Sequence, residues 1–205
     1  KNCNTRSMLH TAKYMNQIAR SADEAYEEIF KEIDITNLVD KKGIIYVWSN
    51  KNLKSRELEI KVRNDLGIKQ KILSQKEVLD LEPNLSPIFD AGILYENSMF
   101  ARDPHAILKK IFKLFLAKGG RFVQENIKSL KQIDKNNTII NSEKEKYNFE
   151  KVVVAAGAFS KHFTDQLGEK IPLDTERGYH VHFKGMSNLL NRPVICLDRG
   201  FSLSP

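Results

Sequence analysis

The chain has 205 residues, of which 41% are hydrophobic and 29% are charged, values typical of a globular protein. Its longest apolar run, Val152–Phe159, is far shorter than the roughly 20 residues that cross a bilayer. We therefore expect no transmembrane segment, no signal peptide, no collagen-like repeat and no extended disorder. The chain begins at Lys1 and stops at Pro205 just after a strand-like run, so we expect it to be a piece of a longer protein.

The formal net charge of +7 is concentrated in residues 109–151, which carry eleven basic and five acidic side chains. A basic segment can indicate nucleic-acid binding. Here the cations are mostly lysines along amphipathic elements, without the interleaved aromatic residues on which bases stack. The pattern favours a solvated lysine face, and we predict no nucleic-acid partner.

Cysteine and histidine usage gives little sign of a metal site. Cys3 and Cys196 are the only cysteines and lie far apart in the sequence, which favours a reducing compartment. His180 and His182 would share one face of a strand, but no carboxylate stands at a natural spacing for a third ligand. We predict no metal, and a cytoplasmic location or a peripheral one at the inner face of the membrane.

The first half of the chain alternates helices and strands. An apolar stripe at steps of three and four residues predicts one long amphipathic helix over about residues 6–33. The β-branched and aromatic run Gly43–Trp48 predicts a strand. A helix should follow from Ser55, with Gly67 in the usual C-terminal glycine position.

The next elements are marked by capping signals. Ser74 and Glu77 have the spacing of a capping box for a short helix that ends at Pro83, and Gly92–Tyr95 predicts a strand. Asp103-Pro104 is a strong helix start, and Gly119-Gly120 should end that helix.

Strands dominate the remainder of the predicted fold. They are expected at Arg121–Glu125, Thr138–Asn141, Lys151–Ala156, Gly178–Phe183 and Pro193–Leu197. Lys151–Ala156 is apolar throughout, as strands buried on both faces of an α/β sheet are. The element order predicts a mixed α/β (α+β) fold in two interleaved units, a layered α/β unit over about 104–160 and a more antiparallel one over about 43–100 and 171–205.

Two segments could carry chemistry. Val152–Ser160 predicts a buried strand that ends in small residues, a place where open α/β sheets bind nucleotides. A tight strand-to-helix turn that needs small residues only for packing explains it equally well. Glu176–His180 gathers a guanidinium, a phenol and an imidazole, groups that bind carboxylates and move protons, although an exposed strand edge is the plainer alternative.

Three common signatures do not occur in the sequence: G-x-G-x-x-G, the P-loop and G-x-S-x-G. Local motifs therefore give no reaction class by themselves.

Taken in order, several segments resemble a known family: LEPNL, GILYENSMFARDP, GGRF, VVVAAGAFS, and G-x-x-IPL leading to ERGYHV. The chain resembles FAD-dependent oxidoreductases of the D-amino-acid oxidase superfamily, and within it most resembles the D-amino-acid dehydrogenase branch (small subunit). The likeness covers nearly all 205 residues.

This resemblance implies part of a Rossmann-like FAD domain interleaved with a mostly antiparallel substrate domain. It assigns residues 1–40 to a helix attached to the FAD domain and residues 41–103 to the first part of the substrate domain. Residues 104–168 become part of the FAD-binding domain, and residues 169–205 the second part of the substrate domain.

The resemblance also implies roles for individual residues. The backbone of Ile127 would contact the adenine, and Ala155, Ala156 and Gly157 would form the nucleotide-facing turn. Arg177, Tyr179 and His180 match the segment that leads back to the substrate domain near the flavin and are the substrate-side candidates. The catalytic residues remain unknown.

The implied reaction is hydride transfer from the amine-bearing carbon of a D-amino acid to the flavin, which gives a 2-oxo acid and ammonia after hydrolysis. A small-molecule amino acid or amine would be the substrate, and a quinone-linked electron acceptor is a further partner. The alternatives are a glycine or sarcosine oxidase-like enzyme and a non-catalytic binding module derived from this fold.

The family's G-x-G-x-x-G strand and helix would lie before Lys1, and the part that completes the flavin pocket would lie after Pro205. Because the helix N-terminus that holds the pyrophosphate is then missing, we predict that the isolated 205 residues bind FAD weakly or not at all and are inactive.

Overall fold

The computed structural model describes residues 4–49, 54–186 and 189–205. It divides into two units, one formed by the residues up to Gly120 together with Phe183–Pro205, the other by Arg121–His182. Both units mix helices with small sheets, which confirms the predicted mixed α/β class.

The predicted long N-terminal helix is two helices, α1 (Thr5–Ala19) and α2 (Ala22–Phe30). The break falls at Arg20-Ser21, where Ser21 leaves helical geometry (ψ 9°) to become the N-cap of α2. Neither helix contains a fully buried residue. The apolar stripe predicted most of the helical residues, but it predicted neither the break at Arg20-Ser21 nor the end at Phe30.

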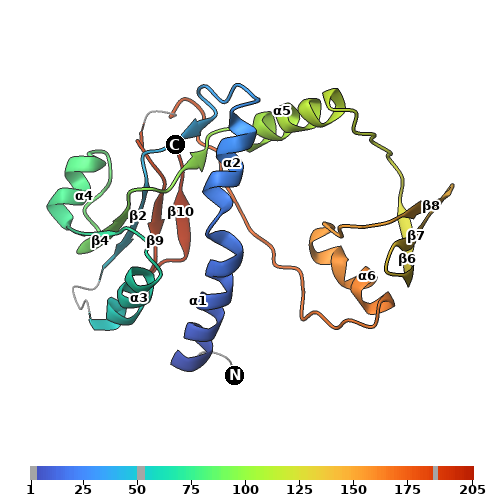
Figure 1. Cartoon of the computed structure of the whole chain (residues 1–205). Coiled ribbons are helices and arrows are strands. Elements are labelled where there is room, and N and C mark those ends of the chain that lie inside the picture. Colours follow the sequence, from blue (N-terminus) through green and yellow to red (C-terminus); the bar gives the residue numbers. More distant parts are fainter. Residues whose placement is uncertain (1–3, 50–53, 187–188) are drawn as a thin grey trace. The chain divides into compact units, whose positions relative to one another are not determined.

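The first unit is built on a five-stranded sheet with the order β10-β9-β2-β4-β3 (Figure 1). Every neighbouring pair is antiparallel except β2 and β9, which run parallel. The strands are β2 (Ile44–Trp48), β3 (Lys71–Ser74), β4 (Ala91–Tyr95), β9 (Val194–Cys196) and β10 (Phe201–Leu203). A second, two-stranded sheet pairs β1 (Val39–Asp40) with β5 (Phe100–Ala101). The strands predicted at 43–48, 92–95 and 193–197 are thereby confirmed.

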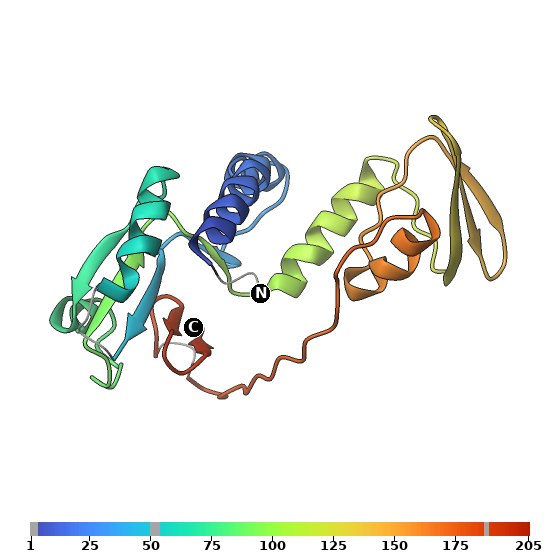
Figure 2. The same cartoon turned by 90° about the horizontal axis from the view of Figure 1, so that it is seen from below.

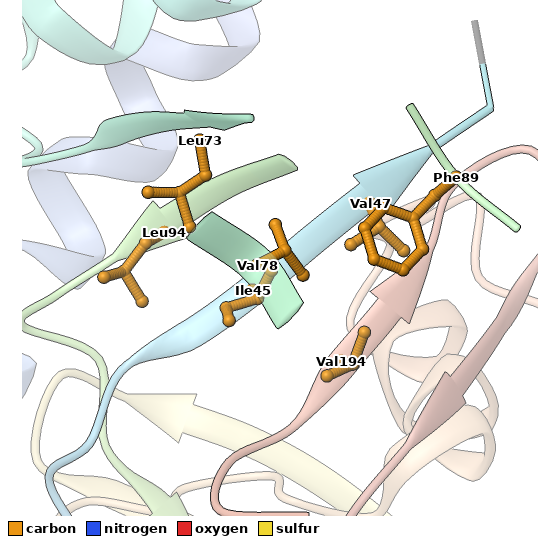
Figure 3. Close-up of a cluster of buried hydrophobic side chains, with 7 residues drawn as sticks. All are labelled: Ile45, Val47, Leu73, Val78, Phe89, Leu94 and Val194. Carbon is orange, nitrogen blue, oxygen red and sulfur yellow. The ribbon is translucent and has the colours of Figure 1, made fainter. Parts of the chain in front are cut away.

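Helices cover both faces of the five-stranded sheet. On one face, α4 (Gln75–Leu81) inserts Val78 into a cluster of buried side chains that converge from β2, β3, β4 and β9 (Figure 3). This cluster consists of Ile45, Val47, Leu73, Val78, Phe89, Leu94 and Val194. On the other face, α3 (Lys54–Asp65) packs Ile60 against a smaller cluster of Trp48, Ile93 and Tyr95.

The capping predictions are confirmed. The Ser74 hydroxyl accepts a hydrogen bond from the backbone of Glu77, and the Glu77 carboxylate accepts one from the backbone of Ser74. The Glu77 carboxylate accepts hydrogen bonds from both the backbone N–H and the hydroxyl of Ser74, and these bonds hold its pKa below its usual range because they favour the charged form. At α5 (Pro104–Ala117), Asp103 accepts from the Ala106 N–H at 2.9 Å, with Pro104 in the first turn.

A buried ion pair fixes β9 beside β2. The Glu82 side chain is 0% exposed and accepts a hydrogen bond from Arg192 Nε at 2.9 Å, while Arg192 is 14% exposed. The other Glu82 oxygen accepts from the Asn191 backbone N–H at 2.8 Å. Arg192 also donates to the Lys42 carbonyl oxygen, at the entrance to β2. The pair therefore joins the end of α4, the start of β2 and the start of β9.

A second polar contact fixes the other end of β9. Asp198 accepts hydrogen bonds from both the backbone N–H and the hydroxyl of Ser49, which follows β2. These bonds lower the pKa of Asp198, and the nearby Arg56 guanidinium lowers it further.

The second unit is a three-stranded antiparallel sheet with a short helix (Figure 2). Its strands are β6 (Ile127–Asp134), β7 (Asn137–Ser142) and β8 (Lys146–Phe149); the short 3₁₀ turn η1 (Gly157–Phe159) and α6 (Ser160–Gln166) follow. The strand predicted at 138–141 is confirmed as β7.

Three predicted strands are wrong in this structure. Arg121–Glu125, Lys151–Ala156 and Gly178–Phe183 belong to none of the ladders in the described residues. Val153, expected to be buried, is 89% exposed. A strand needs a neighbouring strand to form hydrogen bonds with its backbone groups. The apolar pattern of these segments indicates burial but does not specify such a neighbour.

No helix in the described part of the chain is long and apolar enough to cross a membrane. The same part contains no group of three or more His, Cys, Asp or Glu side chains that could hold a metal ion.

Gly43 and Gly67 provide a matched test of the turn into β2. Both have a φ of 76°, but a Cβ on Gly43 would lie 2.7 Å from the Tyr95 carbonyl oxygen, whereas a Cβ on Gly67 would meet nothing within 4 Å. We predict that Gly67→Ala lowers the free energy of unfolding by about 1–2 kcal/mol, the cost of the left-handed backbone alone. Gly43→Ala should cost clearly more, because a backbone clash is added.

Urea denaturation of both variants, followed by far-UV circular dichroism, measures this difference. Equal losses in the two variants would contradict the close approach of Gly43 to Tyr95.

Candidate functional site

The turn at Ala155–Gly157 leads from the extended segment into η1 and α6. Gly157 has a φ of 55°, and a Cβ built on it would meet nothing within 4 Å. Ala155 and Gly157 are exposed and Ala156 is half-buried. The Ala156 N–H donates to the Ser160 hydroxyl at 3.1 Å, which fixes the turn against the first residue of α6. The outcome is an open turn of small residues.

Helix α6 holds this turn close to the start of β6. The Lys128 carbonyl oxygen lies 3.3 Å from His162 Nε2, and the Leu130 N–H donates to Gln166 Oε1 at 2.8 Å. Gln166 in turn lies 2.9 Å from His162. Ile127, the first residue of β6, therefore begins a strand that is tied to the helix following the turn. The structure brings Ile127 and the 155–157 turn onto adjoining elements of one unit.

The substrate-side candidates Arg177, Tyr179 and His180 lie in an extended, exposed stretch of the same unit. Tyr179 is 88% exposed. The His180 ring stands edge-on to His182, with 5.0 Å between ring centroids. The structure therefore leaves these three side chains exposed.

Sequence reasoning missed the side chains that support the turn. Gln166 and His162 lie four residues apart on α6, and both reach the outer edge of β6. An i, i+4 pair of polar residues on a short helix after a glycine turn was the available signal. Nothing in the sequence indicated which strand the pair would contact.

Comparison with known proteins identifies the family of this chain. The profile of the family described as FAD dependent oxidoreductase (DAO) matches residues 5–205. The chain belongs to the FAD-dependent oxidoreductase family. The resemblance inferred from the ordered segments is thereby confirmed, and FAD is the cofactor on which the family depends.

Two curated relatives of this chain are named after their action on D-amino acids. A D-amino-acid oxidase of Bradyrhizobium diazoefficiens is 28% identical over 171 residues, which is 83% of this chain and 41% of that protein. A D-amino acid dehydrogenase of Neisseria meningitidis is 23% identical over 187 residues, 88% of this chain and 44% of that protein. The chain thus spans less than half the length of these relatives.

Solved structures support the fold. Glycine oxidase from Geobacillus kaustophilus matches with a TM-score of 0.66 at 13% identity, covering 100% of this chain and 54% of that one. L-proline dehydrogenase from P. horikoshii matches with a TM-score of 0.64 at 16% identity, covering 97% of this chain and 51% of that one. At these identities the likeness concerns the fold alone.

The contact between β6 and α6 can be tested through Gln166. Gln166→Ala removes the acceptor of the part-buried Leu130 N–H, so we predict a loss of about 1 kcal/mol in the stability of the second unit. Gln166→Glu keeps an acceptor oxygen and serves as the matched control. Hydrogen exchange of the β6 amides measures the effect, and unchanged Leu130 exchange in Gln166→Ala would contradict the contact.

Proposed function

We propose that this chain is part of an FAD-dependent enzyme that oxidises D-amino acids to 2-oxo acids and ammonia. The observation that carries the proposal is the family match over residues 5–205, together with relatives named D-amino-acid oxidase and D-amino acid dehydrogenase. When bound, the flavin supplies the hydride acceptor, and the protein supplies binding, orientation and electrostatics.

The residues at the 155–157 turn suit a role in holding FAD. The positive φ of Gly157 and the open space above it leave room for a bulky group, and the small side chains of Ala155 and Ala156 do not obstruct the backbone. We assign these three residues to the nucleotide-facing turn. The backbone of Ile127, on the strand tied to α6, would contact the adenine.

On the substrate side we retain Arg177, Tyr179 and His180. A guanidinium can bind a substrate carboxylate through two parallel hydrogen bonds, and the side chain of Arg177 is exposed. We propose that Arg177 binds the carboxylate, while Tyr179 and His180 orient the amine or hold a proton.

The domain assignment also remains a proposal, with residues 104–168 in the FAD-binding domain and residues 1–40 attached to it. Residues 41–103 and 169–205 would belong to the substrate domain. The ion pairs of Lys110 with Asp34 and of Lys118 with Glu32 support this grouping, because they join α5 to the segment that follows α2.

A glycine or sarcosine oxidase-like activity is the second candidate, because solved glycine oxidases share this fold. Both candidates use an amino acid or amine and differ in the substituents at the reacting carbon and nitrogen. The electron acceptor would be oxygen in an oxidase and a quinone-linked chain in a dehydrogenase. We propose a cytoplasmic site of action, either free or peripheral to the membrane.

The decisive experiment uses the complete polypeptide that contains these 205 residues, loaded with FAD. It should oxidise D-amino acids faster than glycine or sarcosine, measured by release of 2-oxo acid with oxygen or with a quinone analogue as acceptor. Arg177→Met should raise KM for D-amino acids at least tenfold with the flavin absorbance unchanged, and Lys170→Met is the matched control. Preference for sarcosine would favour the second candidate, and an FAD-loaded protein inactive on all of these substrates would contradict both.

A further inference from the structure

Strand β8 forms an open edge of the three-stranded sheet. Among the described residues it pairs only with β7, in the strand order β6-β7-β8. The opposite edge, at β6, is covered in part by α6, because the Leu130 N–H donates to Gln166 Oε1 at 2.8 Å. The edge at β8 is therefore the one where a further strand can add to the ladder of backbone hydrogen bonds.

The backbone groups of every second residue of β8 point away from β7. The Ser142 N–H donates to the Glu145 carbonyl oxygen at 2.9 Å, so these two residues form a hydrogen-bonded pair at the start of the ladder. Hydrogen-bonded and non-hydrogen-bonded pairs alternate along antiparallel strands. The odd-numbered residues of β8 therefore bond to β7, whereas the N–H and carbonyl groups of Lys146 and Asn148 face outward.

The side chains along this edge are complementary to their own sequence read in reverse. Residues 146–150 are a lysine, an aromatic residue, an asparagine, an aromatic residue and a glutamate. In an antiparallel pair of such strands centred on Asn148, Lys146 lies opposite Glu150 and Tyr147 lies opposite Phe149, and each pair occurs twice. Opposite charges and aromatic side chains directly across from one another stabilise antiparallel strands.

The exposure of these side chains suits such a contact. Tyr147 and Phe149 lie on one face of β8 with their rings stacked, 6.2 Å between centroids, and Phe149 is 48% exposed. Lys146, Asn148 and Glu150 are exposed as well. A second strand at this edge would cover part of the aromatic pair and bring each charged side chain to one of opposite sign.

We propose that β8 pairs with β8 of a second copy of this chain, antiparallel and centred on Asn148, to give a continuous six-stranded sheet. The outward backbone groups of Asn148 in the two copies then bond to each other, as the alternation of the ladder requires. A register centred on Tyr147 or on Phe149 would lose the charge pairs, because Asn148 would then face Lys146 or Glu150. The contact is two-fold and uses the same edge of both copies, so it ends at a dimer.

Sedimentation equilibrium of the complete polypeptide that contains these residues tests the pairing. Because the paired segment is short, we expect a weak dimer with a dissociation constant on the order of 0.1 mM. Lys146→Glu and Glu150→Lys each place like charges opposite one another twice and should each weaken dimerisation about tenfold. Combining the two substitutions restores opposite charges and should return the dissociation constant to within about threefold of the original.

Lys144→Glu is the matched control, since Lys144 is exposed in the turn before β8 and the charge change is the same. It should leave the dissociation constant unchanged. A protein that stays monomeric up to about 1 mM would overturn the proposal. Losses that add in the combined variant would also overturn it, as would a dimer that all the variants form equally well, because another surface would then join the copies. None of these outcomes depends on the proposed reaction.

Discussion

The parallel pairing of β2 with β9 is the constraint on which the first unit depends. The two strands lie about 150 residues apart in sequence, with Tyr46 beside Ile195 in the register. Such a distant contact carries a large loop-closure cost and needs specific interactions to be maintained. The buried Glu82–Arg192 ion pair provides one of them, and the Asp198–Ser49 hydrogen bonds provide another at the opposite end of the strand.

This arrangement explains why the C-terminal segment belongs to the first unit although 62 residues intervene. Val194 is fully buried among side chains from β2, β3, β4 and α4, so β9 contributes to the core as well as to the sheet. A buried carboxylate is costly unless its oxygens are satisfied, and Glu82 meets this condition through Arg192 and Asn191. Among the described residues of the second unit, Leu130 and Thr138 are buried, and the contact of Gln166 with Leu130 joins its helix to its sheet.

Sequence patterns predicted the elements whose determinants are local. The Ser74–Glu77 capping box and the Asp103-Pro104 helix start depend on residues within one turn, and both formed as predicted. Lys151–Ala156 did not form a strand, because the pattern specifies burial on two faces and the described residues provide no neighbour. The role of Glu82 was unpredictable, since its partner lies 110 residues away.

The candidate site was predictable to a similar degree. The small residues at 155–157 indicated an open turn, and the structure shows one with a positive φ at Gly157. His162 and Gln166 on α6 support this turn. Their role could be predicted only with knowledge of the strand that they contact. The roles proposed for Arg177, Tyr179 and His180 rest on the family resemblance, and all three residues are exposed in the structure.

The most direct test of the central claim is a double-mutant cycle on Glu82 and Arg192, measured by urea denaturation. Arg192→Met leaves a fully buried carboxylate unpaired and should cost about 3–5 kcal/mol. Glu82→Met should cost less, because the partly exposed Arg192 can turn toward water. The double variant should be more stable than Arg192→Met alone. Strictly additive losses would contradict the claim that this ion pair holds β9 against the core.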